Sequence, residues 1–159
     1  MKPIKFLFAT MIALLALVTL PSCSDDNNED EPAVPAAKAI AGTYAGDMEC
    51  SVMGSASAFE NLSFSLSATD DATVAVTLPA FGEAPMAMPS ITITGVKVTE
   101  ANGISTLATT QCTGTTDSGK SYTCTLSGDV NGNTLNIKFN LQYGAMPMPM
   151  ICSSAATKQ

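Results

Sequence analysis

Apolar and polar residues alternate along most of the chain after residue 40. The clearest run is Thr134-Leu135-Asn136-Ile137-Lys138-Phe139-Asn140-Leu141, and similar runs occupy residues 61–67, 73–78 and 91–98. A period of two places successive side chains on opposite faces of a strand, one toward a core and one toward water. The pattern therefore predicts an all-β domain, and no segment has the periodicity of an amphipathic helix.

Turn residues divide this region into eight predicted strands. Asn102-Gly103 and Asn131-Gly132 are typical of tight hairpins, because glycine readily adopts the positive φ that such turns need. Short connections favour antiparallel pairing of neighbours, and closure removes the two exposed edges of a sheet. We therefore predict an eight-stranded antiparallel up-and-down β-barrel. Its strands are expected at residues 42–53, 59–68, 72–79, 88–99, 103–114, 120–130, 133–142 and 145–153.

The first 22 residues have the pattern of a signal peptide. Lys2 and Lys5 precede an apolar run over residues 6–20, which is shorter than the ~20 apolar residues of a spanning helix. Leu20-Pro21-Ser22-Cys23 then resembles the bacterial lipobox, although Pro21 departs from its commonest form. The resemblance implies cleavage before Cys23 and attachment of lipid to its thiol. We expect membrane anchoring without a span; the alternative is a secreted protein with a chance cysteine.

An acidic segment follows Cys23, and residues 23–39 are predicted to be a disordered tether. Its charge and stiffness come from Asp25, Asp26, Glu29, Asp30, Glu31, Pro32 and Pro35. The acidic run resembles the export signal that sends Bacteroidota lipoproteins to the outer face of the outer membrane; a plain solvated linker is the alternative. We expect an outer-membrane protein exposed at the cell surface, with the periplasmic face as the alternative, and a folded domain at residues 40–159.

Four cysteines remain after Cys23, and an even number in an exported domain suggests disulfides. Three connectivities are open. We favour Cys112–Cys124, because the two residues flank the turn at 117–119 symmetrically. We also favour Cys50–Cys152, which would join the first strand to the last. Reduced, buried cysteines are the competing interpretation.

Three segments together resemble the calycin-like lipoproteins of Bacteroidota. They are Ile40-Ala41-Gly42-Thr43-Tyr44-Ala45-Gly46, Ile93-Thr94-Gly95-Val96-Lys97-Val98 and the run at residues 126–135. The resemblance covers residues 40–152 and rests on glycines, turns and alternation. It implies a lipocalin-like or streptavidin-like barrel. It supplies no catalytic residues, because the family has none that are established.

The composition disfavours most enzyme and nucleic-acid functions. The chain has 7 Lys against 14 acidic residues, and it contains no His, Arg or Trp. The usual near-neutral general base and the commonest zinc ligand are therefore missing, and no basic face exists for phosphates. Asp47 and Glu49 share one face of a strand and Asp70 and Asp71 share a turn; we interpret these acids as solvent-facing charge. We expect no enzymatic activity, no bound metal, no cofactor and no nucleic-acid partner.

Methionines gather in two similar segments, Pro85-Met86-Ala87-Met88-Pro89 and Met146-Pro147-Met148-Pro149-Met150. Three interpretations are open. Alternate methionines can fill a barrel core, and they can adapt to an apolar ligand or partner. Clustered thioethers can also hold Cu(I). Core filling is the interpretation we favour.

The leading functional hypothesis is a tethered barrel that binds a small hydrophobic ligand or an envelope protein. An eight-stranded barrel can enclose one small ligand or be filled by its own side chains. A filled structural or accessory lipoprotein is therefore the alternative, and a hydrolase inhibitor is suggested by fold analogy alone. The candidate ligand-lining residues are Phe64, Leu66, Val76, Met86, Met88, Phe139, Met146 and Met148.

Overall fold

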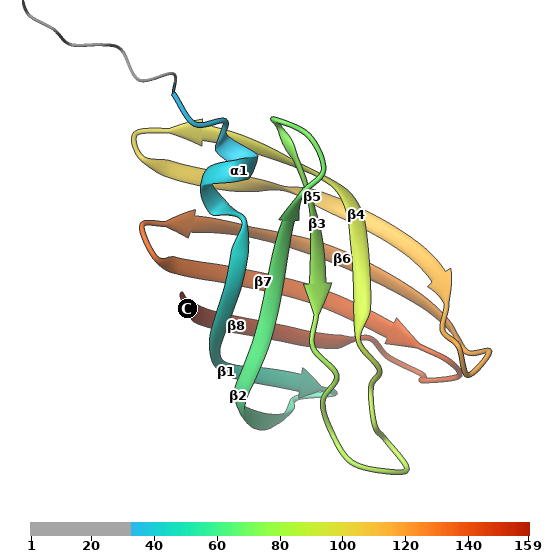
Figure 1. Ribbon diagram of the computed structural model, residues 1–159. Coiled ribbons are helices and arrows are strands. Elements are labelled where there is room, and N and C mark those ends of the chain that lie inside the picture. Colours follow the sequence, from blue (N-terminus) through green and yellow to red (C-terminus); the bar gives the residue numbers. More distant parts are fainter. Residues whose placement is uncertain (1–32) are drawn as a thin grey trace, which may run out of the picture. The chain divides into compact units, whose positions relative to one another are not determined.

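Eight antiparallel strands follow one another along the chain and close into a barrel in the computed structural model, which describes residues 33–159 (Figure 1). Each strand pairs with the next, and β8 returns to β1, so the predicted barrel is confirmed. The predicted signal peptide, Cys23 and tether residues 23–32 lie outside the described residues. The strands are β1 (Gly42–Val52), β2 (Ser55–Ala68), β3 (Thr73–Leu78), β4 (Ile91–Ala101), β5 (Ile104–Thr115), β6 (Ser121–Asn131), β7 (Thr134–Tyr143) and β8 (Met150–Lys158).

Three strands have boundaries that differ from the prediction by more than two residues. β2 begins four residues early, β4 begins at Ile91 instead of residue 88, and β8 covers 150–158 instead of 145–153. Prolines explain the last two differences, because proline has no N–H to donate to the hydrogen-bond ladder. Pro89 precedes β4, and Pro149 directly precedes β8. Within β8 the alternation is regular, and Met150, Cys152, Ser154 and Ala156 are buried.

A short helix, α1 (Ala36–Ile40), precedes β1 and occupies the last residues of the segment predicted to be a tether. Five residues are too few for a helix to be stable alone, so tertiary contacts must hold it. Ala37 and Ile40 are buried, and the Tyr44 hydroxyl donates a hydrogen bond to the Ile40 carbonyl at 2.7 Å. Lys38 Nζ lies 2.8 Å from Asp71 Oδ1. α1 therefore belongs to the folded domain.

The inward side chains of all eight strands form one hydrophobic core, joined by Ala37 and Ile40 of α1. A bulge maintains this pattern between β3 and β4. Val74 pairs with Val96 while Val76 pairs with Ile93, so β4 carries one extra residue. Gly95 has φ +75°, a conformation that suits glycine at such a bulge. Ile93 and Val96 consequently both face the core, although they are three positions apart.

One of the two predicted disulfides is present. Cys50 and Cys152 are directly paired residues of β1 and β8 and are bonded through sulfur, as predicted. Cys112 and Cys124 are also directly paired, in β5 and β6, but their thiols are free, so the second predicted bond is absent. Burial raises the pKa of both thiols, and for Cys124 the pKa reaches about 12.

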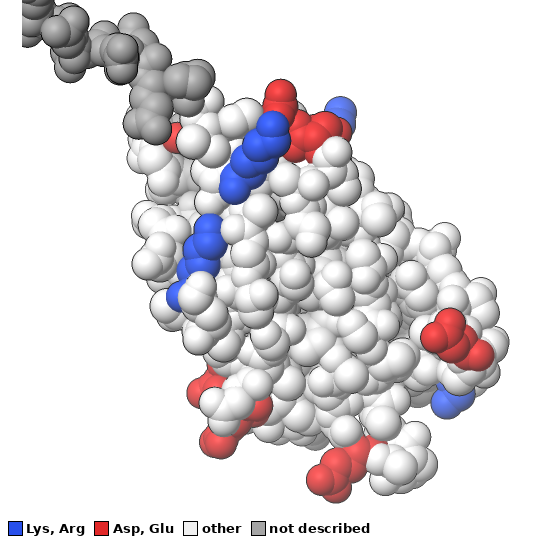
Figure 2. Space-filling view, viewed as in Figure 1, with Lys and Arg blue, Asp and Glu red and all other residues white. Residues whose placement is uncertain are grey.

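The barrel surface carries few charges on one broad face. Figure 2 shows that face, on which the acidic and basic side chains lie mostly toward the margins and leave a wide uncharged area. Among residues 33–159, no helix has the length and apolar character needed to span a bilayer.

Candidate functional site

The loops between β3 and β4 and between β7 and β8 emerge at the end of the barrel opposite α1 (Figure 1). A pocket lies between residues of these loops. We call it the loop-end pocket. Its volume is about 370 Å³. It is lined by Pro85, Met86, Met88, Lys120, Tyr143, Gly144, Ala145 and Met146.

The loop between β3 and β4 is held in a hairpin-like shape by Phe81 and Met88. Phe81 N–H donates to the Met88 carbonyl at 3.1 Å, and Met88 N–H donates to the Phe81 carbonyl at 2.8 Å. The Phe81 ring packs on Phe59 of β2, with ring centroids 5.1 Å apart. Met88 is therefore buried, whereas Met86 at the tip of the loop is 62% exposed. The loop presents one fixed and one accessible thioether to the pocket.

The loop between β7 and β8 forms the facing wall. Gly144 N–H donates to the Ser121 carbonyl at 2.8 Å, and Met146 N–H donates to the Tyr143 carbonyl at 3.3 Å. The side-chain amide of Gln142 donates to the Met146 carbonyl. These bonds hold Met146 beside the end of β7. Two proline-flanked methionine segments, about sixty residues apart in the sequence, thus meet on one pocket.

Lys120 and Tyr143 supply the polar groups of this pocket. Lys120 Nζ lies 5.4 Å from the centre of the Tyr143 ring, which is within the range of a cation–π contact. The Tyr143 hydroxyl shares a hydrogen bond of 3.3 Å with Ser118 Oγ. Hydrogen bonds with Ser118 and Thr116 lower the pKa of Tyr143; the Lys120 charge acts in the same direction, and desolvation opposes them. The pocket therefore joins apolar walls to one cationic edge.

The structure separates the predicted ligand-lining residues into three groups. Met86, Met88 and Met146 border the loop-end pocket. Met148 belongs to the same sequence pattern but is half-exposed and is not among the residues lining either hollow. The four residues predicted to line the barrel interior pack in the core at 2% exposure or less and border neither hollow: Phe64, Leu66, Val76 and Phe139. Lys120 and Tyr143 were not predicted.

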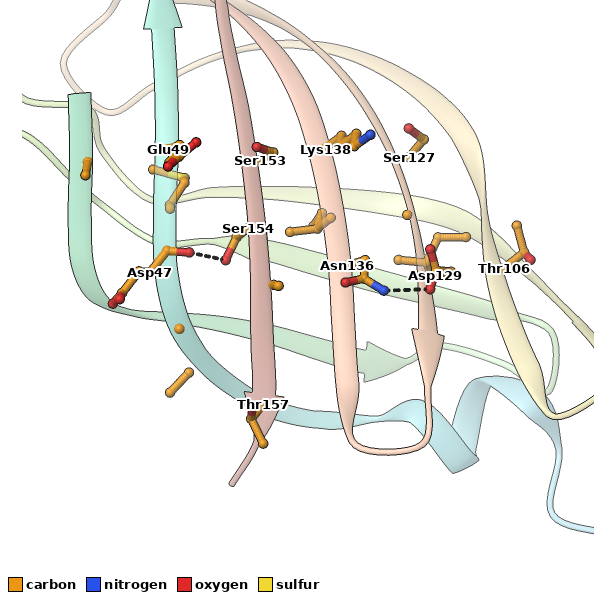
Figure 3. A pocket seen from close by; sticks show the side chains of 18 of the residues that line it. Asp47, Glu49, Thr106, Ser127, Asp129, Asn136, Lys138, Ser153, Ser154 and Thr157 are labelled. Atoms are coloured by element: carbon orange, nitrogen blue, oxygen red, sulfur yellow. Dashed lines mark hydrogen bonds between the residues drawn. The ribbon is translucent and has the colours of Figure 1, made fainter. Parts of the chain in front are cut away.

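The second hollow, which we call the outer-face hollow, lies on the outer side of β1, β8, β7 and β6 and has a volume of about 1060 Å³ (Figure 3). Glu49, Ser153, Lys138 and Ser127 form one row across these four strands, each paired with the next. Their neighbours along the strands point into the core, so the row faces solvent. Register shifts between β1 and β2 and between β5 and β6 flank the hollow, and such bulges bend a sheet.

Several polar groups of the outer-face hollow already have partners. Asn136 Nδ2 donates to Asp129 Oδ2 at 2.9 Å, and Ser154 Oγ donates to the Asp47 carbonyl at 2.7 Å (Figure 3). Asp47 Oδ1 accepts the Asn61 N–H at 3.0 Å. The charged side chains lining the hollow are Asp47, Glu49, Glu60, Asp129 and Lys138. The charges that line the hollow are thus mainly acidic.

A metal site built from carboxylates or thiols is not present in the described part of the chain. Residues 33–159 contain no group of three or more acidic or cysteine side chains arranged to hold an ion. The soft ligands that share a pocket are the thioethers of Met86, Met88 and Met146, and Lys120 lies beside them. A cation there would be repelled by the ammonium group. The geometry therefore favours an apolar ligand over Cu(I).

Comparison with known proteins agrees with the fold. No curated protein matches the sequence. A solved structure from Bacteroides fragilis, described as a "putative outer membrane protein", superposes with a TM-score of 0.68 at 27% identity; the match covers 79% of this chain. This chain spans about half of that protein, since 53% of its length is covered. The calycin-like β-barrel domain profile matches residues 40–152. The chain therefore belongs to the calycin-like β-barrel domain family.

Proposed function

We propose that this protein is a lipid-anchored component of the outer membrane whose loop-end pocket binds a small apolar ligand. The observation that carries the proposal is the meeting of two distant proline-flanked methionine segments on one pocket. A volume of about 370 Å³ falls within the ~300–1,000 Å³ typical of small-molecule sites. Unbranched thioether side chains adapt to ligands of different shape.

The filled core moves the proposed site from the barrel interior to its rim. Phe64 and Phe139 are buried among other core side chains, and interiors packed in this way leave little room for a guest. The loops at the opposite end from α1 carry the accessible apolar groups instead. Ligand contacts are therefore expected from loop residues, which a homologue with the same barrel could vary freely.

Docking of an envelope protein is the second candidate function. Exposed apolar side chains surround the same end of the barrel, at Met53 (77%), Met86 (62%), Ile151 (59%) and Met148 (49%). Clustered exposed apolar groups commonly mark an interaction surface. A structural protein without a ligand would bind its partner through these exposed residues alone.

The anchor is supported by the lipobox at residues 20–23, by the acidic run after it and by the description of the Bacteroides fragilis protein. Dual or triple acylation would hold the protein stably, because a single chain binds only marginally. We expect Cys23→Ala to remove metabolic palmitate labelling and membrane association. Protease treatment of intact cells then tests surface exposure. An unchanged membrane fraction in this variant would overturn the anchor.

Ligand binding can be tested through the methionine methyl groups by NMR, using protein labelled with ¹³C-methyl methionine. Added 1-decanol is expected to shift the signals of Met86, Met88 and Met146, which border the pocket, and not that of buried Met48. Met146→Gln should weaken this response, and Met148→Gln is the matched control outside the pocket. Shifts that are uniform across all methionines, or absent at saturation, would contradict the site.

A further inference from the structure

We infer that the ligand of the loop-end pocket carries one anionic group, a carboxylate on an apolar chain, and that Lys120 recognises it. This inference rests on the proposed function and adds to it the chemical class of the ligand. Lys120 is the only charged residue that lines the pocket; the other lining residues are proline, methionine, alanine, glycine and tyrosine. In an apolar pocket, a single charged group determines which polar end a ligand can have.

The turn between β5 and β6 fixes the backbone of Lys120. Thr116 N–H donates to the Lys120 carbonyl at 2.9 Å, and Gly119 N–H donates to the Thr116 carbonyl at 2.8 Å. The Thr116 hydroxyl also donates to the Lys120 carbonyl, at 3.2 Å. Gly119 adopts φ +77°, which a non-glycine residue rarely does. These hydrogen bonds close the chain into a tight loop that holds the backbone of Lys120.

The side chain of Lys120 forms part of the pocket wall. A Cβ atom built on Gly144 would be 3.6 Å from Lys120 Cδ, so the aliphatic stem passes close to the Gly144 backbone. The ammonium group continues over the Tyr143 ring, 5.4 Å from its centre. The stem contacts apolar surface while the residue as a whole is exposed, so the charged end remains accessible to a ligand. A ligand inserted among the methionines would therefore present its outer end to Nζ.

Lys120 has no carboxylate partner within the structure. Among residues 33–159, the only side-chain ion pair joins Lys38 to Asp71, at 2.8 Å. The ammonium therefore has donors available for a ligand oxygen, and an ionised acceptor forms the stronger hydrogen bond. The outer-face hollow has the opposite character, since four carboxylates face one lysine there. An apolar anion is consequently directed to the loop end and repelled from the larger hollow.

Three probes of equal chain length separate charge recognition from apolar binding: decanoate, 1-decanol and decylammonium. Each is titrated below its micelle concentration at pH 8 while the methyl signals of Met86, Met88 and Met146 are followed. We expect decanoate to bind about five-fold more tightly than 1-decanol and decylammonium to bind most weakly. The exposed position of Lys120 limits the expected effect to this size. High salt should reduce the difference.

Lys120→Gln removes the charge and should abolish the preference for decanoate over 1-decanol. Lys97→Gln, on the exposed face of β4, is the matched control. Circular dichroism checks that both variants fold. Equal affinity of wild-type protein for decanoate and 1-decanol would overturn the charge recognition and leave the proposed function standing. Absence of any site-specific shift with all three probes would overturn both.

Discussion

Cys50 and Cys152 occupy directly opposed positions on β1 and β8, and their disulfide links the first strand of the barrel to the last. The two residues are 102 positions apart in the sequence. Every other neighbouring pair of strands is joined by a turn or loop, whereas β1 and β8 have no local connection. The bond therefore fastens the one seam of the barrel that the chain itself leaves open.

Loss of this bond is predicted to weaken the fold substantially. The double variant Cys50→Ala/Cys152→Ala should lower the free energy of unfolding by about 2–4 kcal/mol, because a long loop is released in the unfolded chain. Urea denaturation measures the change. Wild-type protein held under reductant serves as the control and should lose a similar amount. A difference below about 0.5 kcal/mol would show that the β1–β8 ladder holds the seam without the bond.

The free pair, Cys112 and Cys124, is predicted to react unequally with iodoacetamide. Burial, the charge of Cys112 and the hydrogen bond donated to it raise the pKa of the Cys124 thiol to about 12. Burial also raises the pKa of Cys112, but this residue is partly exposed. Since the thiolate is the reactive form, native protein in which Cys23 is lipidated should gain one adduct slowly at pH 8, at Cys112. The rate should rise about tenfold per pH unit below the pKa.

Mass spectrometry of the intact protein before and after alkylation counts the adducts directly. Unfolding without reductant should expose Cys124 and add a second adduct, while the Cys50–Cys152 bond stays closed. Cys112→Ala is the control and should acquire no adduct in the native state. If native and unfolded protein both take up nothing until a reductant is added, the thiols are joined in solution and the free pair is an incorrect description.

The barrel could be predicted because its signals are local. Alternation defines which face of each strand is buried, and glycine turns such as Asn131-Gly132 mark where the chain reverses. α1 could not be found in this way. Its five residues have no measurable period, and the groups that hold it, Asp71 and the Tyr44 hydroxyl, belong to other elements. Pro149 indicates that β8 begins after it. The alternation of methionine with proline at residues 146–150 nevertheless resembles a strand, and the predicted start was therefore too early.

The candidate site was only half visible in the sequence. The two methionine segments were recognised by composition, and three of their methionines do share a pocket. Met146 and Met148 belong to the same alternating Met-Pro segment, yet only Met146 lines the pocket. The alternation alone does not distinguish the two residues. Lys120 and Tyr143 become neighbours because β6 and β7 pair, so that Tyr122 opposes Tyr143 beside the turn. Such a contact depends on how β6 and β7 align with each other, which the pattern within either strand does not specify.

Tyr44→Phe tests how α1 is attached. The hydroxyl is fully buried and donates to the Ile40 carbonyl at 2.7 Å, so its removal leaves a buried acceptor without its partner. We expect a loss of about 1–2 kcal/mol in the free energy of unfolding. Tyr143→Phe is the control, because its hydroxyl bond to Ser118 is longer, at 3.3 Å, and less buried. A smaller loss for Tyr44→Phe than for the control would contradict this attachment.

Gly128 is predicted to be indispensable to the pairing of β6 and β7. A Cβ at this position would lie 2.4 Å from the backbone oxygen of Asn136 and 3.2 Å from Ile137 Cα. Backbone atoms in a closed ladder cannot move aside as the end of a flexible side chain can. Gly128→Ala should therefore cost about 1–3 kcal/mol in the free energy of unfolding, the range seen for overpacked sites.

The neighbouring variant Ser127→Ala provides the comparison for Gly128→Ala, since Ser127 faces the outer-face hollow and should tolerate the change within about 0.5 kcal/mol. Urea unfolding measures both variants. Amide hydrogen exchange adds a local measure, because a forced separation of β6 and β7 should raise exchange in that ladder before it does in β3 and β4. Equal stability of the two variants would mean that the strands spread at no cost, and the close approach at Gly128 would then have no structural importance.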